Sequence, residues 1–208
     1  MFTKTRTFAA CAVLALAVTG CKKTDDNRIN FTTAIDNYYA AHPVCLWETP
    51  MKFPVQADTS DADKTRTYDA LVDQGLLART TAEKKVMIIA SKQVNNYDLS
   101  DKGRSAWTAD ATQPGYGNFC YGHRKVTSID AWTPTTNQPG AVTTVQYHYS
   151  LTGAPDWATN PETQTAFPNV RTALATPAAG SNKLTLTTSG WQITGGGIAS
   201  DPDANIVH

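Results

Sequence analysis

The segment AVTTVQYHYSL (residues 141–151) decides the fold class, because its side chains alternate with a period of two. One face carries Val145, Tyr147, Tyr149 and Leu151, and the other carries Thr144, Gln146, His148 and Ser150. Alternation of this kind is typical of a strand with one face on the core and one in solvent. We therefore predict a half-buried antiparallel strand, with His148 exposed on its polar face.

Two flanking segments extend this sheet. KVTSIDAW (125–132) alternates in the same way, and TPTTNQPG (133–140) joins it to 141–151 with a turn near Gln138-Pro139-Gly140. In KLTLTTSGWQI (183–193), leucines alternate with threonines before a Ser-Gly turn. We expect an antiparallel sheet built from 125–132, 141–151 and 183–193. Between the last two, a short helical stretch should begin at Pro161, because proline suits a first helical turn.

Helical patterns dominate the first hundred residues. Phe31, Ile35, Tyr38, Tyr39 and His42 have the spacing of one helix face. A second helix is expected over 61–75, capped by Ser60 or Asp61 and closed near Gly75. Prolines at 43, 50 and 54 predict that the segment between the helices is extended and lies at a sheet edge.

The region after the second helix predicts a hairpin. Strands are expected at 86–90 and 94–99, and Ser100 should cap a short helix or turn that runs to Trp107. The order of LVDQGLL (71–77) and NYDLSDKGR (96–104) resembles the winged-helix pattern over about 40 residues. The resemblance implies a helix that ends at Gly-Leu-Leu and a β-wing that leads to Leu-Ser-x-x-Gly-Arg.

The order of these patterns predicts an α+β fold. Helical periodicity precedes residue 108 and strand alternation follows residue 125, an order that favours segregated helices and strands. We expect a helix-rich N-terminal half, with a small wing-like hairpin (86–99), packed on a C-terminal antiparallel sheet. Residues 29–208 are expected to form a single domain, because a chain of this length can build one sizeable core.

Charge argues against a nucleic-acid partner. Helix 61–75 carries four aspartates (Asp61, Asp63, Asp69, Asp73) against Lys64 and Arg66. Those carboxylates would repel phosphate at the position where a winged helix reads DNA. The whole chain has 18 Lys and Arg and 18 Asp and Glu, so it has no overall field that would attract nucleic acid. We predict no binding to duplex DNA.

The first twenty residues have the features of an export signal. Lys4 and Arg6 precede an apolar run from Phe8 to Val18, which is too short to span a membrane. The run ends at Val18-Thr19-Gly20-Cys21, which resembles the lipobox of bacterial lipoprotein precursors. The resemblance implies cleavage before Cys21 (leader 1–20), followed by multiple acylation of that cysteine. An ordinary secretory cleavage site is the alternative.

Lipidation would fix the location of the protein. More than one acyl chain gives stable membrane attachment, whereas a single chain binds weakly. Lys22 follows the cysteine, which in the enteric sorting pattern implies the outer membrane. Residues 21–28 would then be a polar tether, and the body would lie in the periplasm or at the cell surface. We expect the lipid bilayer as one partner, and another envelope protein or a cell-wall component as a second.

Cysteine usage predicts one disulfide. Cys11 leaves with the leader and Cys21 is used by lipid, so Cys45 and Cys120 remain together in an oxidising compartment. Their bridge would close a loop of about 75 residues, which the chain-entropy model values at roughly 4 kcal/mol. The alternative makes Cys120 a nucleophile with His123 as its base in FCYGHRK. We predict the bridge, because a free thiol would be oxidised in that compartment.

The aromatic segment around Cys120 is the candidate interaction surface. Tyr116, Phe119, Tyr121 and His123 lie within TADATQPGYGNFCYGHR (108–124). These aromatic side chains could line a ligand surface, or they could pack around the disulfide. Both interpretations stay open at the level of sequence.

The chain contains no common catalytic or metal-binding motif. H-E-x-x-H, G-x-S-x-G, a Gly-rich phosphate loop and C-x-x-C are missing from the sequence, and the four histidines lack metal-ligand spacing. We therefore assign no catalytic residue, no metal and no cofactor. A non-catalytic binding module is the leading hypothesis. The alternatives are a periplasmic hydrolase or peptidoglycan-acting enzyme with a non-local active site, for which His123 or His148 beside a carboxylate would argue, and a small-ligand carrier.

Overall fold

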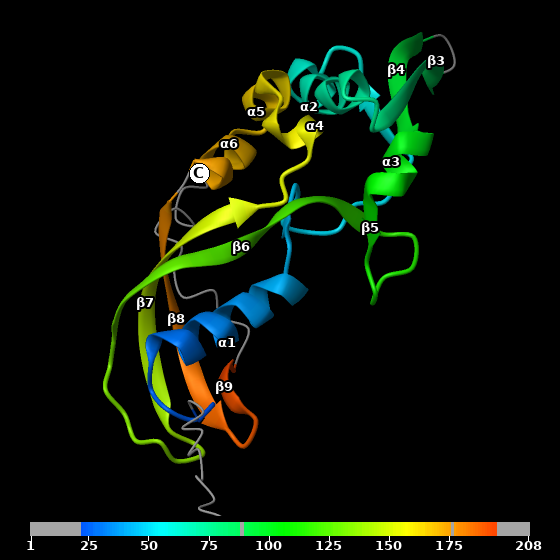
Figure 1. Ribbon diagram of the computed structural model, residues 1–208. Helices are drawn as coiled ribbons and strands as arrows, with labels where there is room; N and C mark the ends of the chain where they lie inside the picture. Colours follow the sequence, from blue (N-terminus) through cyan, green and yellow to red (C-terminus); the bar gives the residue numbers. More distant parts are fainter. Residues whose placement is uncertain (1–21, 88–89, 176, 195–208) are drawn as a thin grey trace, which may run out of the picture.

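The computed structural model describes residues 22–87, 90–175 and 177–194, and it contains two antiparallel sheets (Figure 1). The six-stranded sheet has the order β1-β6-β7-β8-β9, with β5 also paired to β6. Its strands are β1 (Val44–Cys45), β5 (Trp107–Ala109), β6 (Gly117–Trp132), β7 (Val142–Thr152), β8 (Ala178–Thr187) and β9 (Gly190–Ile193). The three-stranded sheet has the order β2-β4-β3, from β2 (Val55–Asp58), β3 (Leu77–Met87) and β4 (Ala90–Leu99).

The larger sheet curls around the first helix, α1 (Arg28–Ala41) (Figure 1). Asn27 caps this helix by accepting a hydrogen bond from the Asn30 N–H. Helix α1 contacts both β6 and β9, because the strands between them bend around its apolar side. The resulting core contains the following buried side chains: Phe31, Ala34, Ile35, Tyr39, Ile129, Val145, Tyr147, Tyr149, Leu184, Leu186 and Trp191.

A small polar cluster lies inside this core. The Tyr147 hydroxyl hydrogen-bonds to the Asn182 amide oxygen and lies 3.1 Å from the Tyr39 hydroxyl. Burial raises the pKa of Tyr147 well above its ordinary value, so the phenol stays neutral. The cluster satisfies polar groups that would be costly to bury alone.

The segments predicted as strands at 125–132, 141–151 and 183–193 lie in β6, β7 and the β8–β9 hairpin. The predicted turn is also present. Ala141 donates a backbone hydrogen bond to the Gln138 carbonyl (3.0 Å), and Gly140 has a φ of 92°. Proline followed by a left-handed glycine is the pattern of a type II turn.

Helix α2 (Ala62–Asp73) has the ends that its sequence predicts. The Asp61 side chain accepts a hydrogen bond from the Lys64 N–H. At the other end Gly75 has a φ of 70°, and its N–H donates to the Val72 carbonyl. The Leu76 N–H donates to the Leu71 carbonyl, which completes a Schellman motif. The helix therefore stops where the chain turns into β3.

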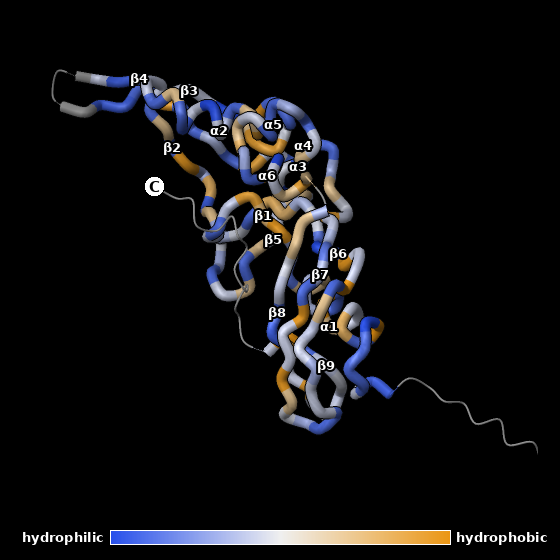
Figure 2. Tube along the Cα trace, turned by 90° about the vertical axis from the view of Figure 1, so that its left-hand side faces the viewer, coloured by the Kyte–Doolittle hydropathy of each residue, from blue (hydrophilic) through white to orange (hydrophobic). Residues whose placement is uncertain are grey.

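Strands β3 and β4 form a long hairpin that projects from one end of the body (Figure 2). Ten residue pairs join the strands, from Leu77↔Leu99 to Met87↔Ala90. The expected strand at 86–90 is wrong, because β3 ends at Met87 and β4 begins at Ala90. Residues 88–89 lie outside the described residues. The expected strand at 94–99 is the proximal half of β4, which also pairs with β2.

Helix α3 (Asp101–Ala106) follows the hairpin and is capped by Ser100, as predicted. The Ser100 hydroxyl accepts a hydrogen bond from the Gly103 N–H at 2.8 Å. Gly103 itself lies against the backbone of Leu76, so close that a Cβ built on it would come 1.8 Å from the Leu76 carbonyl oxygen. Only glycine allows α3 to approach the end of α2 this closely.

Three short helices come from the C-terminal half and pack near α2. They are α4 (Asp156–Thr159), α5 (Pro161–Ala166) and α6 (Pro168–Leu174). Pro161 starts α5 as predicted, whereas α4 and α6 were not expected. A second core forms here from the following buried residues: Leu46, Ala57, Tyr68, Leu71, Leu76, Leu77, Tyr97, Phe119, Tyr121, Trp157, Ala158, Phe167 and Val170.

The expected α+β fold with a helix-rich N-terminal half is therefore wrong. Strands predominate throughout the described residues, and the N-terminal half supplies the whole three-stranded sheet. The halves are also interleaved: α1 packs on the C-terminal strands, while α5 contacts α2. The first part of β3, residues 77–85, was not predicted as a strand, because residues 78–85 are exposed and show no alternation of apolar and polar side chains. The described residues do not form a winged-helix fold.

Candidate functional site

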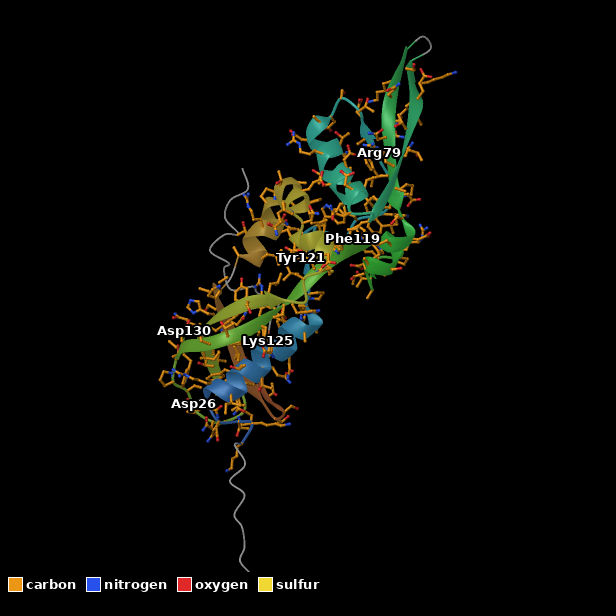
Figure 3. The ribbon with its side chains drawn as sticks, turned by 45° about the horizontal axis from the view of Figure 1, so that its top comes forward. Asp26, Arg79, Phe119, Tyr121, Lys125 and Asp130 are labelled. Atoms are coloured by element: carbon orange, nitrogen blue, oxygen red, sulfur yellow. A yellow bond between two sulfur atoms is a disulfide. The ribbon has the colours of Figure 1, made fainter. Side chains whose placement is uncertain are left out.

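The four side chains of the predicted interaction surface separate into two pairs. Phe119 and Tyr121 are buried and point from β6 into the core beside Trp157, on the face of β6 opposite to Cys120, so they pack in the core and not around the disulfide (Figure 3). Burial raises the pKa of Tyr121 to about 12. Tyr116 is half-buried with the Lys52 ammonium 5.7 Å from its ring centre, and His123 is exposed with its ring nitrogen 3.1 Å from the Tyr39 carbonyl oxygen.

Cys45 and Cys120 form a disulfide, as predicted. The two residues face each other in register on β1 and β6, with their Cα atoms 3.8 Å apart. This separation lies well inside the 7 Å limit for a bridge. The nucleophile role considered for Cys120 is therefore incompatible with the oxidised chain, since a disulfide sulfur is no thiolate.

A groove with a volume of about 600 Å³ lies over the disulfide, and we call it the disulfide groove. Its walls come from positions within 41–50 on one side and 108–110 on the other, and Gly117, Asn118 and Cys120 form its floor. The alternation of β6 explains the floor: Phe119 and Tyr121 point to the core, so Asn118 and Cys120 point to the groove.

The walls of the disulfide groove are fixed to its floor. The Asn118 amide donates to the Trp47 carbonyl (2.6 Å) and accepts from the Trp47 N–H (3.2 Å), so both ends of the amide are used. Met51 and Gly117 exchange two backbone hydrogen bonds at 2.8 and 2.9 Å. Together with the disulfide, these bonds hold segment 44–51 against β6. A groove that is formed before binding avoids the entropic cost of ordering it.

The charge of the disulfide groove is negative at neutral pH. Glu48 and Asp110 lie on opposite walls, and none of the described residues that line the groove is Lys or Arg. Hydrogen bonds from Thr112 and from the backbone N–H of Gln113 lower the pKa of Asp110 below its ordinary value. Asp110 therefore keeps its charge to lower pH than a free aspartate does.

Two segments of the sequence, one near each cysteine, carry a partial signal for this groove. CLWETP (45–50) contains Trp47, Glu48 and Pro50, and TADATQPG (108–115) contains Asp110 and Pro114. Once Cys45 and Cys120 are paired, the chain segments beside the two cysteines must also lie close together. That inference brings Trp47 and Glu48 beside β6, whereas Asp110 is brought there by the pairing of β5 with β6.

Two further clusters have the residue types of catalytic sites but not their geometry. On the exposed face of β6 and β7, Ser128 and His148 both bind the same carboxylate, Asp130, at 2.9 and 2.7 Å (Figure 3 labels Asp130). The serine hydroxyl donates to the aspartate and not to the histidine, so the cluster does not have the serine–histidine–aspartate order of an activated nucleophile. His148 is half-exposed beside a carboxylate, as the hydrolase alternative requires, but it lines none of the grooves described here.

The second cluster surrounds His123 at the end of α1. Its pocket of about 160 Å³ also contains Asp36 and Lys125. Asp36 accepts from the Val126 N–H (2.9 Å) and pairs with Lys125 (2.6 Å), so its oxygens already have partners. Among the described residues, no three His, Cys, Asp or Glu side chains gather closely enough to hold a metal ion.

Within the described ranges, no helix combines the length and the apolar composition needed to cross a bilayer. Cys21 and the leader lie outside the described residues, so the lipid anchor stays a prediction. Comparison of this chain with protein-family models, with curated proteins and with solved structures finds no match.

Proposed function

We propose that this protein is a lipid-anchored bacterial envelope protein whose body is a non-catalytic binding module, with the disulfide groove as its binding surface. The observation that carries the proposal is a preformed groove of about 600 Å³ that holds two carboxylates and is lined by no Lys or Arg among its described residues. Such a groove complements a segment that carries a positive charge. The partner class that we propose is a basic, extended segment of another envelope component.

The shape and chemistry of the walls support an extended ligand. Pro43 and Pro50 line one wall together with Trp47, whose ring is half-buried. The Trp47 ring packs edge-to-face against the Trp107 ring, with 6.3 Å between the ring centres. It is tilted against the Phe119 ring, whose centre lies 5.9 Å away. A fixed aromatic ring beside prolines offers apolar contact at low entropic cost, and the two carboxylates add charge specificity.

Binding in the disulfide groove can be tested by photo-crosslinking in intact envelopes. A benzophenone amino acid in place of Thr108, an exposed wall residue, should give a discrete adduct. Neutralising the wall charges with E48Q and D110N together should reduce that adduct at least fivefold, because the attraction depends on both carboxylates. Raised salt should reduce it as well, since exposed charges are screened.

The matched control places the same crosslinker at Thr144, an exposed position on β7 outside the groove. It should give no such adduct. An adduct that is the same from both positions, or one that is insensitive to E48Q/D110N, would argue against the groove as the binding surface.

The lipid anchor has its own test. Replacing Cys21 with serine should abolish incorporation of labelled fatty acid and leave an unprocessed or released form, because the thiol is the acceptor of the lipid. Cys11 offers a control, since C11S changes a leader cysteine that is discarded on processing. Normal membrane retention of C21S would contradict the anchor, whatever the groove binds.

A further inference from the structure

A second groove, separate from the disulfide groove, lies between α1 and the edge strand β9. Its volume is about 530 Å³. One wall is a stripe of α1 that includes Thr33, Ala34, Asn37 and Tyr38, and the other wall is formed by residues 189–193. We call it the edge groove.

Strand β9 ends the six-stranded sheet. Of the strands in the described part of the chain, β8 alone pairs with β9, through four residue pairs from Thr187↔Gly190 to Leu184↔Ile193. Among the described residues, no backbone group outside β8 hydrogen-bonds to the backbone of Trp191, Gln192 or Ile193. Within the described ranges, the outer side of β9 therefore presents N–H and C=O groups that no other strand pairs with, which is the template for an added strand.

Helix α1 lies beside this edge, so the side chains of a strand added to β9 could pack against it. Trp191 pairs with Leu186 and Ile193 with Leu184, so both face the core and α1. The Trp191 ring packs against Phe31 at 5.2 Å, and its indole N–H donates to the Asp25 carbonyl at 3.1 Å. Alternate residues of a strand added to β9 would point the same way, into the space in front of α1.

The lining defines what those residues should be. Asn37 and Tyr38 supply amide and hydroxyl groups, while Ala34 and Ile193 supply apolar surface. Lys23 is the one charged residue among the described residues of the lining. Lys23 lies beside Gly190, because a Cβ built on that glycine would come 3.5 Å from the Lys23 Cβ. An acidic residue is favoured at that end and uncharged residues elsewhere.

We propose that β9 binds an extended polypeptide segment of a partner by strand addition, with alternate small apolar residues in the edge groove and an acidic residue near Lys23. Main-chain hydrogen bonds supply affinity in this mode, and the groove selects side chains. This proposal concerns another surface and does not rest on the function proposed for the disulfide groove.

The test selects peptides from a random dodecapeptide display library on the purified full chain in detergent, and then measures their affinity as free peptides. Substituting T33W should fill the edge groove and weaken the selected peptides at least tenfold. A40W, at another exposed position of α1, should leave their affinity within twofold. N37W serves as a second groove-filling variant if T33W unfolds, with the thermal unfolding curve as the check.

A chemical control separates strand addition from other contacts. N-methylation of alternate residues in a selected peptide removes main-chain donors and keeps every side chain. It should abolish binding in one of the two alternation frames. Equal binding of both methylated forms, no enriched peptide at all, or peptides insensitive to both groove-filling variants would each overturn the proposal. Binding that appears only after residues 195–208 are deleted would assign the edge groove to this chain's own segment and overturn the assignment to a partner.

Discussion

Replacing Cys45 and Cys120 together with alanine should lower the free energy of unfolding by about 4 kcal/mol, the upper figure for a loop of this length in the chain-entropy model. The bridge joins residues 75 positions apart, so its loss gives the unfolded chain many more conformations. Urea unfolding should show a lower midpoint. The slope of the transition should rise as well, because the unfolded chain without its cross-link exposes more surface.

The folded state should respond locally to the same change. Strand β1 has only two residues, and segment 44–51 is held to β6 by the bridge, the Asn118 amide and a few backbone bonds. Hydrogen exchange should therefore accelerate first in 44–51, while β7 and β8 keep their protection. Wild-type protein that is reduced and blocked should match the double variant. Equal urea midpoints for the oxidised wild type and the variant would contradict this prediction, because they would mean that the bridge does not stabilise the folded state.

Gly103→Ala is the second change with a large expected effect, a loss of about 3 kcal/mol in the free energy of unfolding. The new methyl group would meet the Leu76 carbonyl oxygen at 1.8 Å and the Leu76 carbonyl carbon at 2.9 Å. Those atoms belong to the backbone between α2 and β3, which cannot rotate away as a side chain can. Either α3 moves off α2 or the Schellman turn at Gly75 is lost.

A matched substitution in the same helix separates the clash from helix propensity. Ser105 is exposed in α3, and its hydroxyl contacts only the Asp101 carbonyl. Ser105→Ala should therefore change stability by less than about 0.5 kcal/mol. Thermal or urea unfolding of the two variants gives the comparison. A Gly103→Ala variant as stable as Ser105→Ala would mean that α3 is not packed on Leu76 as described.

Sequence patterns correctly predicted the helices and strands whose ends or buried faces are determined by residues close together in the chain. Asp61 and Gly75 delimit α2, Ser100 begins α3, and the alternation of β7 gave the right buried face. Each of these depends on capping or on a two-residue period, which act within a few residues of the chain.

The features of the fold that the sequence did not predict depend on contacts between segments far apart in the chain. No local pattern indicates that α1 would pack on β6 and β9, or that α5 would lie beside α2. Strand β3 has exposed side chains from Ala78 to Lys85, so it lacks the apolar alternation that marks a strand. The disulfide groove was predicted in part. Its cysteines were expected to pair, but Glu48 and Asp110 line the same groove because β1 and β5 both pair with β6.

The position of the β3–β4 hairpin bears on where this protein can meet other molecules. Asp26, just before α1, and Arg79, on the hairpin, lie toward opposite ends of the body (Figure 3). The 11 residues of β3 add roughly 35 Å of reach. If Cys21 carries the lipid anchor proposed above, the hairpin would lie at a distance from the bilayer that the length of the body determines. The length of the body would then set the distance from the bilayer at which the hairpin can reach a partner. Shortening the hairpin would move that point of contact toward the membrane without altering either groove.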